Sequence, residues 1–169
     1  MTIQAEARIS IETLINLLDS SDDKVRRKAR KSLVIIGKPV VLSLAEVLQN
    51  SKVYKARWEA AKALGEIGDA KAIPALVKAL EDPESDVVWL AAEALGKFRK
   101  LAWRELLSAL IRSGSSVTLR NASHHVFRNQ KEKGFDDLLE ALRKALKSGA
   151  VSESTPVAAS NLMERMRAI

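Results

Sequence analysis

Apolar residues along this chain recur at helical spacing, and the helices that they predict come in pairs. Between residues 73 and 80 the apolar positions follow the i, i+3, i+4, i+7 order of an amphipathic helix: Ile73, Leu76, Val77 and Leu80. Pro74 falls in the first turn, where a missing amide hydrogen costs nothing. A second helix is predicted over about 87–98, after a polar turn at 81–86. A pair of helices is therefore the local unit.

This unit repeats along the chain. One leucine of each predicted first helix marks the period: Leu18, Leu48, Leu80, Leu110 and Leu142. The steps between these leucines are 30, 32, 30 and 32 residues, a period typical of helix-pair repeats. We therefore predict an all-α fold, an α-solenoid of about five repeats of 30–32 residues. In such a fold each helix pair buries its remaining apolar surface against the neighbouring pairs. The chain is expected to form one domain, 1–169, with repeats at approximately 11–39, 40–70, 71–100, 101–133 and 134–169.

The composition agrees with closely stacked helices. Hydrophobic residues make up 47% of the chain and aromatic residues only 4%, so the core is built mainly from small aliphatic side chains that let helix axes approach. The chain has no cysteine, which excludes disulfides and thiolate metal sites. Residues 1–10 hold no apolar run of signal-peptide length, and no stretch approaches 18 uninterrupted apolar residues. We expect a soluble, cytoplasmic protein with no membrane partner.

Positive charge is in excess and is concentrated near the N-terminus. The chain has 28 Lys+Arg against 21 Asp+Glu, a net charge of +7 and a pI near 9.8, which favours acidic partners. The segment 24–31, KVRRKARK, places six positive charges on one predicted helix. Its function is either to contact phosphate or an acidic peptide, or simply to form a solvated helix face near the acids of 19–23.

The segments 56–87, ARWEAAKALGEIGDAKAIPALVKALEDPESDV, and 87–98, VVWLAAEALGKF, resemble the phycobilisome-lyase-like HEAT repeat family. The matching features are the helix pattern Val-Arg-x-x-Ala-Ala-x-Ala-Leu-Gly, the Gly-Asp turn and the Ala-Ile-Pro-Ala-Leu helix start. The likeness is strong over about 40–100 and weaker over 11–39 and 102–147. It implies a right-handed α-α superhelix that binds proteins, with bilin attachment confined to a subset of the family.

The resemblance also implies which residues face a partner, because second helices line the concave face in these repeats. The two positions after the motif arginine, and one position a turn later, give the candidate partner-binding residues of the first three repeats: Arg27, Lys28, Lys31, Trp58, Glu59, Lys62, Trp89, Leu90 and Glu93. The fourth repeat departs from the motif, and its alignment is open by one or two residues. Either Arg120 or Asn121 takes the tryptophan position, followed by His124 or His125; the candidate set is completed with Asn121 and His125.

Trp58 and Trp89 stand 31 residues apart at one repeat position, so we expect them on neighbouring helices of one face. We favour exposed anchors in a groove over partial burial between repeats, because the alanines beside them already fill the packing face. Trp103 replaces Ile73 of the preceding repeat and should belong to the core. Arg26 and Arg57 are expected to be structural, each pairing with an acid of the next repeat.

The sequence offers little catalytic chemistry. The pair His124-His125 cannot readily chelate one metal, because adjacent helix residues point about 100° apart, so no metal and no cofactor are predicted. The His-Glu dipeptide of HEAT-like iron hydroxylases, a Gly-rich phosphate loop and a Gly-x-Ser-x-Gly elbow do not occur in the sequence. HEAT-like DNA glycosylases combine tryptophans with an aspartate, whereas Glu59 and Glu93 stand near the tryptophans here.

We therefore predict a non-catalytic scaffold whose concave face binds another protein or an acidic peptide segment. Two alternatives remain open at this stage. The same basic face could bind nucleic acid through aromatic stacking and phosphate contacts. The chain could also be a bilin-lyase-like chaperone subunit.

Overall fold

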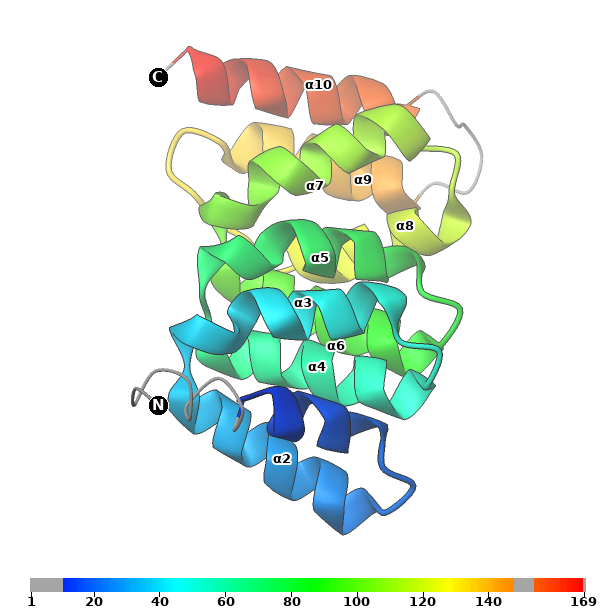
Figure 1. Ribbon diagram of the computed structural model, residues 1–169. Coiled ribbons are helices and arrows are strands. Elements are labelled where there is room, and N and C mark those ends of the chain that lie inside the picture. Colours follow the sequence, from blue (N-terminus) through cyan, green and yellow to red (C-terminus); the bar gives the residue numbers. More distant parts are fainter. Residues whose placement is uncertain (1–10, 148–153, 169) are drawn as a thin grey trace.

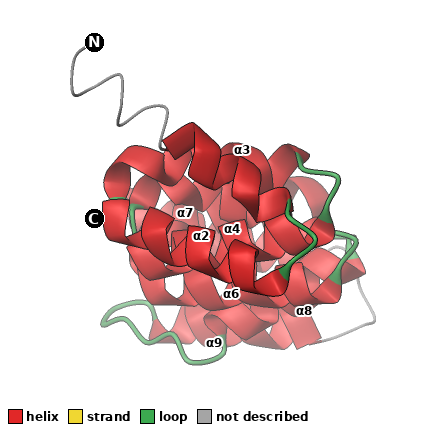
Figure 2. Ribbon diagram, turned by 60° about the horizontal axis from the view of Figure 1, so that its bottom comes forward, coloured by secondary structure: helices red, strands yellow, loops and turns green. Residues whose placement is uncertain are grey.

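The computed structural model describes residues 11–147 and 154–168, and all regular structure in these residues is helical (Figure 2). Residues 11–16 are helical and lead into a 3-10 turn, Leu17–Asp19. The helices that follow are α2 (Asp23–Ile36), α3 (Val41–Asn50), α4 (Tyr54–Ile67), α5 (Ile73–Lys78), α6 (Ser85–Phe98), α7 (Lys100–Ser113), α8 (Val117–Phe127), α9 (Asp136–Lys147) and α10 (Ser154–Arg167). The predicted all-α array of stacked helix pairs is confirmed.

The helices form two layers. In the first-helix layer α3 packs on α5 and α5 packs on α7, and in the second-helix layer α2, α4, α6 and α8 pack in that order. Within each repeat the two layers are joined by direct packing, as between α3 and α4 or between α5 and α6. Figure 1 shows α3, α5, α7 and α10 stacked one above another along the length of the molecule. The apolar core lies between these two layers.

The last two helices occupy the layers in reversed order. We expected 135–147 to be the first helix of a fifth pair, yet α9 packs on α8 in the second-helix layer, while α10 packs on α7 and α9 (Figure 1). Phe135, just before α9, is buried with its ring centroid 5.9 Å from that of Trp103. Trp103 belongs to α7 and also packs against Phe127 at the end of α8, so the segment before α9 is joined to both helices of the fourth repeat.

The predicted core positions are confirmed. All five leucines that mark the period are at most 2% exposed: Leu18, Leu48, Leu80, Leu110 and Leu142. Trp103 is 1% exposed and packs against Phe127 and Phe135, as expected of a core residue. Pro74 lies in the first turn of α5. Gly68 ends α4 in the left-handed region, at φ 68°, where a side chain would be strained.

Small residues set the distance between α4 and α6. A Cβ atom added at Gly65 of α4 would lie 2.9 Å from the Cβ of Ala94 in α6, closer than two such carbons pack. Gly96, at the equivalent position of the next repeat, has nothing within 4 Å of an added Cβ. The two glycines therefore share a motif position but only Gly65 is required for close helix packing.

We expect Gly65→Ala to be less stable than Gly96→Ala. Alanine favours a helix over glycine by about 0.5–1 kcal/mol at both positions, but only at Gly65 does the new methyl group collide with a neighbour. Overpacking costs about 1–3 kcal/mol, so the free energy of unfolding of the two variants should differ by roughly that amount in urea denaturation. Equal stability of the two variants would show that α4 and α6 separate without cost.

Within 11–147 and 154–168, no single helix is long and apolar enough to cross a membrane. The helical segments 23–36 and 38–50 together have enough length and apolar character to span a membrane, but they are bent by 117° relative to each other.

Candidate functional site

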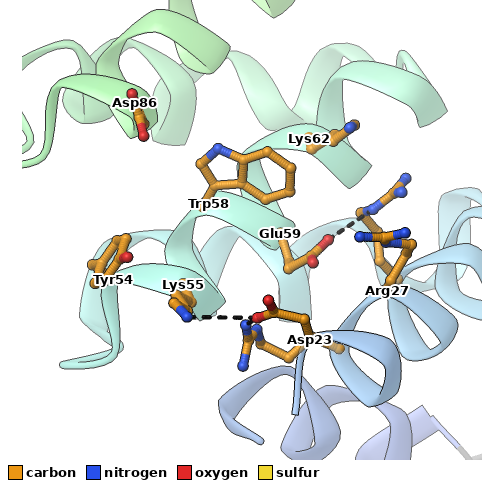
Figure 3. Close-up of a pocket in the computed structure, with 10 residues that line it drawn as sticks. Asp23, Arg27, Tyr54, Lys55, Trp58, Glu59, Lys62 and Asp86 are labelled. Carbon is orange, nitrogen blue, oxygen red and sulfur yellow. Dashed lines mark hydrogen bonds and ion pairs between the residues drawn. The ribbon is translucent and has the colours of Figure 1, made fainter. Parts of the chain in front are cut away.

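A continuous groove runs across the second-helix layer. Hollows lie between α2 and α4, between α4 and α6, between α6 and α8, and between α8 and α9. Each hollow shares at least one lining residue with the next, namely Lys62, then Glu93 and Lys97, then Arg128. The largest hollow, of about 530 Å³, lies between α2 and α4 and is closed on one side by Asp86 of α6 (Figure 3). Eight of the eleven candidate residues line these hollows and are spread along one groove, whereas Lys28, Lys31 and Asn121 line none of the four.

The two groove tryptophans differ in exposure. Trp89 is 54% exposed and lines the hollow between α4 and α6 together with Leu90, over a floor that includes Ala61 and Gly65. Trp58 is only partly exposed and packs against the core. Figure 3 shows Trp58 in the middle of the largest hollow, and the ammonium nitrogen of Lys62 lies 4.8 Å from its ring centroid, a cation–π contact. Trp89 is therefore the freer of the two aromatic surfaces.

Glu59 differs from the expectation that it faces a partner. It is 6% exposed, and its Oε2 accepts a hydrogen bond from Nε of Arg30 at 2.8 Å, across the interface between α4 and α2. Nη1 of Arg30 also donates to Glu66 at 2.5 Å. Because its carboxylate is committed to this internal ion pair, Glu59 holds two repeats together instead of presenting a charge to a ligand.

Arg30 was missed by the sequence analysis because it occupies an alanine position of the repeat motif. In the next interface the equivalent residues are Ala61 and Leu90, which both line the hollow between α4 and α6. A charged residue at a motif alanine was the available signal, since such a residue requires a buried partner.

Three arginines resolve the alignment of the fourth repeat. Arg26, Arg57 and Arg120 each donate from Nη1 to the backbone carbonyl oxygen six residues earlier, that of Ser20, Ser51 or Gly114. Arg120 therefore takes the arginine position of the motif, which places Asn121 at the tryptophan position and His125 one turn later. Asn121 is exposed.

His125 contacts the residues of the third repeat. Its Nε2 lies 2.8 Å from Oε1 of Glu93, and its ring centroid lies 6.3 Å from that of Trp89. Glu93 and His125 are both partly exposed and line the same hollow between α6 and α8. These three side chains therefore form one cluster on the groove, with Trp89 as its exposed member.

The structural role predicted for Arg57 is confirmed. Nε and Nη2 of Arg57 donate to the two carboxylate oxygens of Asp82 in the next repeat, at 2.7 and 3.0 Å, and this hydrogen bonding raises the pKa of Arg57. Arg26 departs from the prediction, because it pairs with Asp23 of its own helix. Ser51 stands where Asp82 stands one repeat later, and a hydroxyl cannot complete an ion pair.

The remaining basic candidates lie on α2. Arg27, Lys28 and Lys31 are exposed. Together with Lys24 they line a hollow of about 220 Å³ whose lining residues are all positively charged. Their spacing of three and four residues places the four on one helix face. None of the four has an ion pair within the described residues.

The part of the chain that the structure describes holds no cluster of three or more His, Cys, Asp or Glu side chains arranged for a metal ion. Glu93 and His125 approach each other, but no third ligand of these types joins them there.

Comparison with known families agrees with this architecture. The family model for HEAT repeats matches residues 41–128, slightly more than half of the chain. The chain belongs to the HEAT repeat family. HEAT repeats commonly act as protein-interaction scaffolds, and the family is generally non-catalytic. A search among curated proteins finds no match to this chain.

The first HEAT repeat interface supplies a test of the buried ion pair. Arg30→Ala leaves the Glu59 carboxylate without its buried partner and should cost about 3–5 kcal/mol of unfolding free energy. The double variant Arg30→Ala/Glu59→Leu reproduces the Ala61 and Leu90 pair of the next interface and should recover most of that loss. Urea denaturation measures both; a double variant as unstable as the single one would show that Arg30 acts through other contacts.

Proposed function

We propose that this HEAT repeat protein is a non-catalytic scaffold that binds an extended acidic segment of a partner protein along its second-helix groove. The observation that carries the proposal is the division of charge in the groove, where acids are paired internally and cations are left free. Family membership supports a protein partner. The groove geometry supports an extended ligand, because its hollows adjoin from α2 to α9.

Four of the six acids that line the groove already pair with an arginine or a lysine. Asp23 pairs with Lys55 and Arg26, Glu59 and Glu66 pair with Arg30, Glu93 contacts His125, and Glu140 pairs with Lys144. Asp86 is the groove acid without an ion pair in the described residues. An incoming carboxylate therefore meets little repulsion from the groove.

Several groove cations have no acidic partner in the described ranges. They are exposed: Arg27, Lys97 and Arg128 line the groove, and Lys24, Lys28 and Lys31 lie beside Arg27 on the same face of α2. Charges of this kind raise the association rate and reject basic ligands more than they add affinity. They select the sign of the ligand.

Trp89 supplies the apolar anchor. A half-exposed tryptophan over a floor of small residues offers a large contact area at little cost in side-chain entropy. Leu90 extends this apolar surface toward α4. A nucleic-acid backbone carries a phosphate at every nucleotide and so would also place charge beside Asp86, which has no ion pair in the described residues. A peptide can carry its acidic side chains opposite the cations alone, so a protein segment fits the groove better than nucleic acid does.

We expect Trp89→Ala to lose the partner while keeping the fold, because the side chain is 54% exposed and truncating it leaves the core intact. The matched control is Leu42→Ala, which truncates a 67% exposed leucine in the opposite layer. Immobilised wild type and both variants would be incubated with nuclease-treated lysate of the native host at low and high salt. Circular dichroism melting would establish that the variants are folded.

A discrete protein retained at high salt by wild type and Leu42→Ala, and lost from Trp89→Ala, supports the proposal. Binding of that purified protein should then shift the indole N–H signals of Trp58 and Trp89 in NMR spectra but not that of buried Trp103. Retention by Trp89→Ala contradicts the anchor. If lysate that has not been treated with nuclease yields only nucleic acid, and high salt releases it, the nucleic-acid alternative is favoured.

A further inference from the structure

A second cationic cleft lies between α8 and α9, at the end of the groove away from α2. It has a volume of about 320 Å³ and is lined by His124 and Arg128 of α8 and by Glu140, Arg143, Lys144 and Lys147 of α9. Arg128 also lines the hollow between α6 and α8, so the cleft opens onto the same groove. The reversed placement of α9 beside α8 creates this cleft.

The cleft carries a large excess of positive charge. Its four permanent cations, two arginines and two lysines, face one carboxylate, that of Glu140, which leaves a charge of +3 (4 − 1) with His124 neutral. Glu140 is bound to Lys144, with Nζ and Oε1 3.0 Å apart. Arg128 and Lys147 are exposed and have no ion pair in the described residues.

Helix ends alone do not explain this arrangement. Cations in the last turn of a helix are stabilised by its negative end, which accounts for basic residues on α8 and on α9 separately. It does not account for Arg128 beside α8 facing the three cations of α9 across a cavity, since like charges on the two sides raise each other's electrostatic energy. A bound anion would relieve that repulsion.

Two observations indicate that the cleft is prepared for an anion. Nη1 of the partly buried Arg143 donates to the backbone carbonyl of Gln130 at 3.3 Å, which orients the guanidinium before any ligand arrives. Burial lowers the pKa of His124, and the positive charges of Lys147, Arg128, His125 and Arg143 lower it further. His124 therefore reports the positive potential of the cleft.

We propose that the cleft between α8 and α9 binds the phosphoryl group of a phosphorylated serine or threonine in the partner segment. A phosphomonoester carries a charge near −2 at neutral pH and three strong acceptor oxygens, which suits two guanidinium groups and a net charge of +3 better than one carboxylate does. The peptide context rests on the proposed function. Anion binding by the cleft stands without it.

The experiment follows the imidazole signal of His124 by NMR, assigned with His124→Gln. Added O-phosphoserine should raise the pKa of His124, because an anion in the cleft favours the imidazolium form. Sodium chloride at the same ionic strength is the reference, and sodium sulfate provides a dianion that does not titrate in this range. Sulfate should also raise the pKa, and glutamate should raise it less than phosphoserine does.

Arg128→Gln/Lys147→Gln should bind phosphoserine about tenfold more weakly. Both side chains are exposed, so the fold should be unaffected. The matched control, Lys71→Gln/Lys78→Gln, removes two exposed lysines at the first-helix layer and should bind phosphoserine like wild type. A pKa of His124 that moves no further with phosphoserine than with chloride, or equal affinity in the two double variants, would overturn the proposal.

The peptide context is tested with the purified partner. Phosphatase treatment of the partner should weaken its binding to wild type but not to Arg128→Gln/Lys147→Gln. No effect of phosphatase on wild type would overturn phosphopeptide recognition even if free phosphoserine binds. If Trp89→Ala loses the partner but the pKa of His124 does not respond to phosphoserine, the anion site in the cleft is overturned and the proposed binding of the partner in the groove stands. If Trp89→Ala keeps the partner and the pKa of His124 responds, the anion site stands and the proposed groove anchor is overturned.

Discussion

The close packing of α4 against α6 is the constraint on which the middle of the groove depends. Gly65 and Ala94 bring α4 and α6 so near that one added methyl group would collide. At this separation the small residues Ala61, Gly65 and Ala94 form a shallow floor, and the longer side chains of the same helices rise beside it. The hollow between α4 and α6 thus follows from the helix spacing, and the exposed Trp89 lies beside its smallest side chains.

The period and the core could be predicted from the sequence because burial follows the apolar pattern directly. Each leucine that marks the period is buried, and Trp103, which replaces an isoleucine of the preceding repeat, lies in the core. The ion pair of Arg30 and Glu59 could not be predicted in the same way. Equivalent residues lie 31 apart, such as Trp58 and Trp89, whereas the contacts across the interfaces span 29 residues for Arg30 and Glu59, 36 for Arg30 and Glu66 and 32 for Glu93 and His125. A repeat motif shows which residues occupy equivalent positions, but it does not show which residues touch each other across an interface.

The period also says nothing about which layer a helix joins. Leu142 continues the series of leucines and is buried, yet α9 lies in the second-helix layer and α10 completes the first. An amphipathic helix with one apolar stripe can bury that stripe on either layer of the array, so the spacing of apolar residues alone does not determine which layer it joins. The exposure of Trp58 and Trp89 differs for a related reason, since the two share a repeat position but have different neighbours.

The buried ion pair between α2 and α4 also bears on how such an array can change in evolution. Repeats that share one motif are in principle interchangeable, because each offers a similar apolar surface to the next. In this chain α2 cannot take the place of α4, since the guanidinium of Arg30 would then face Leu90 instead of Glu59. Duplication or loss of a unit is therefore easier at the junction of α4 and α6 than at the junction of α2 and α4, where charge fixes the order of the first two repeats.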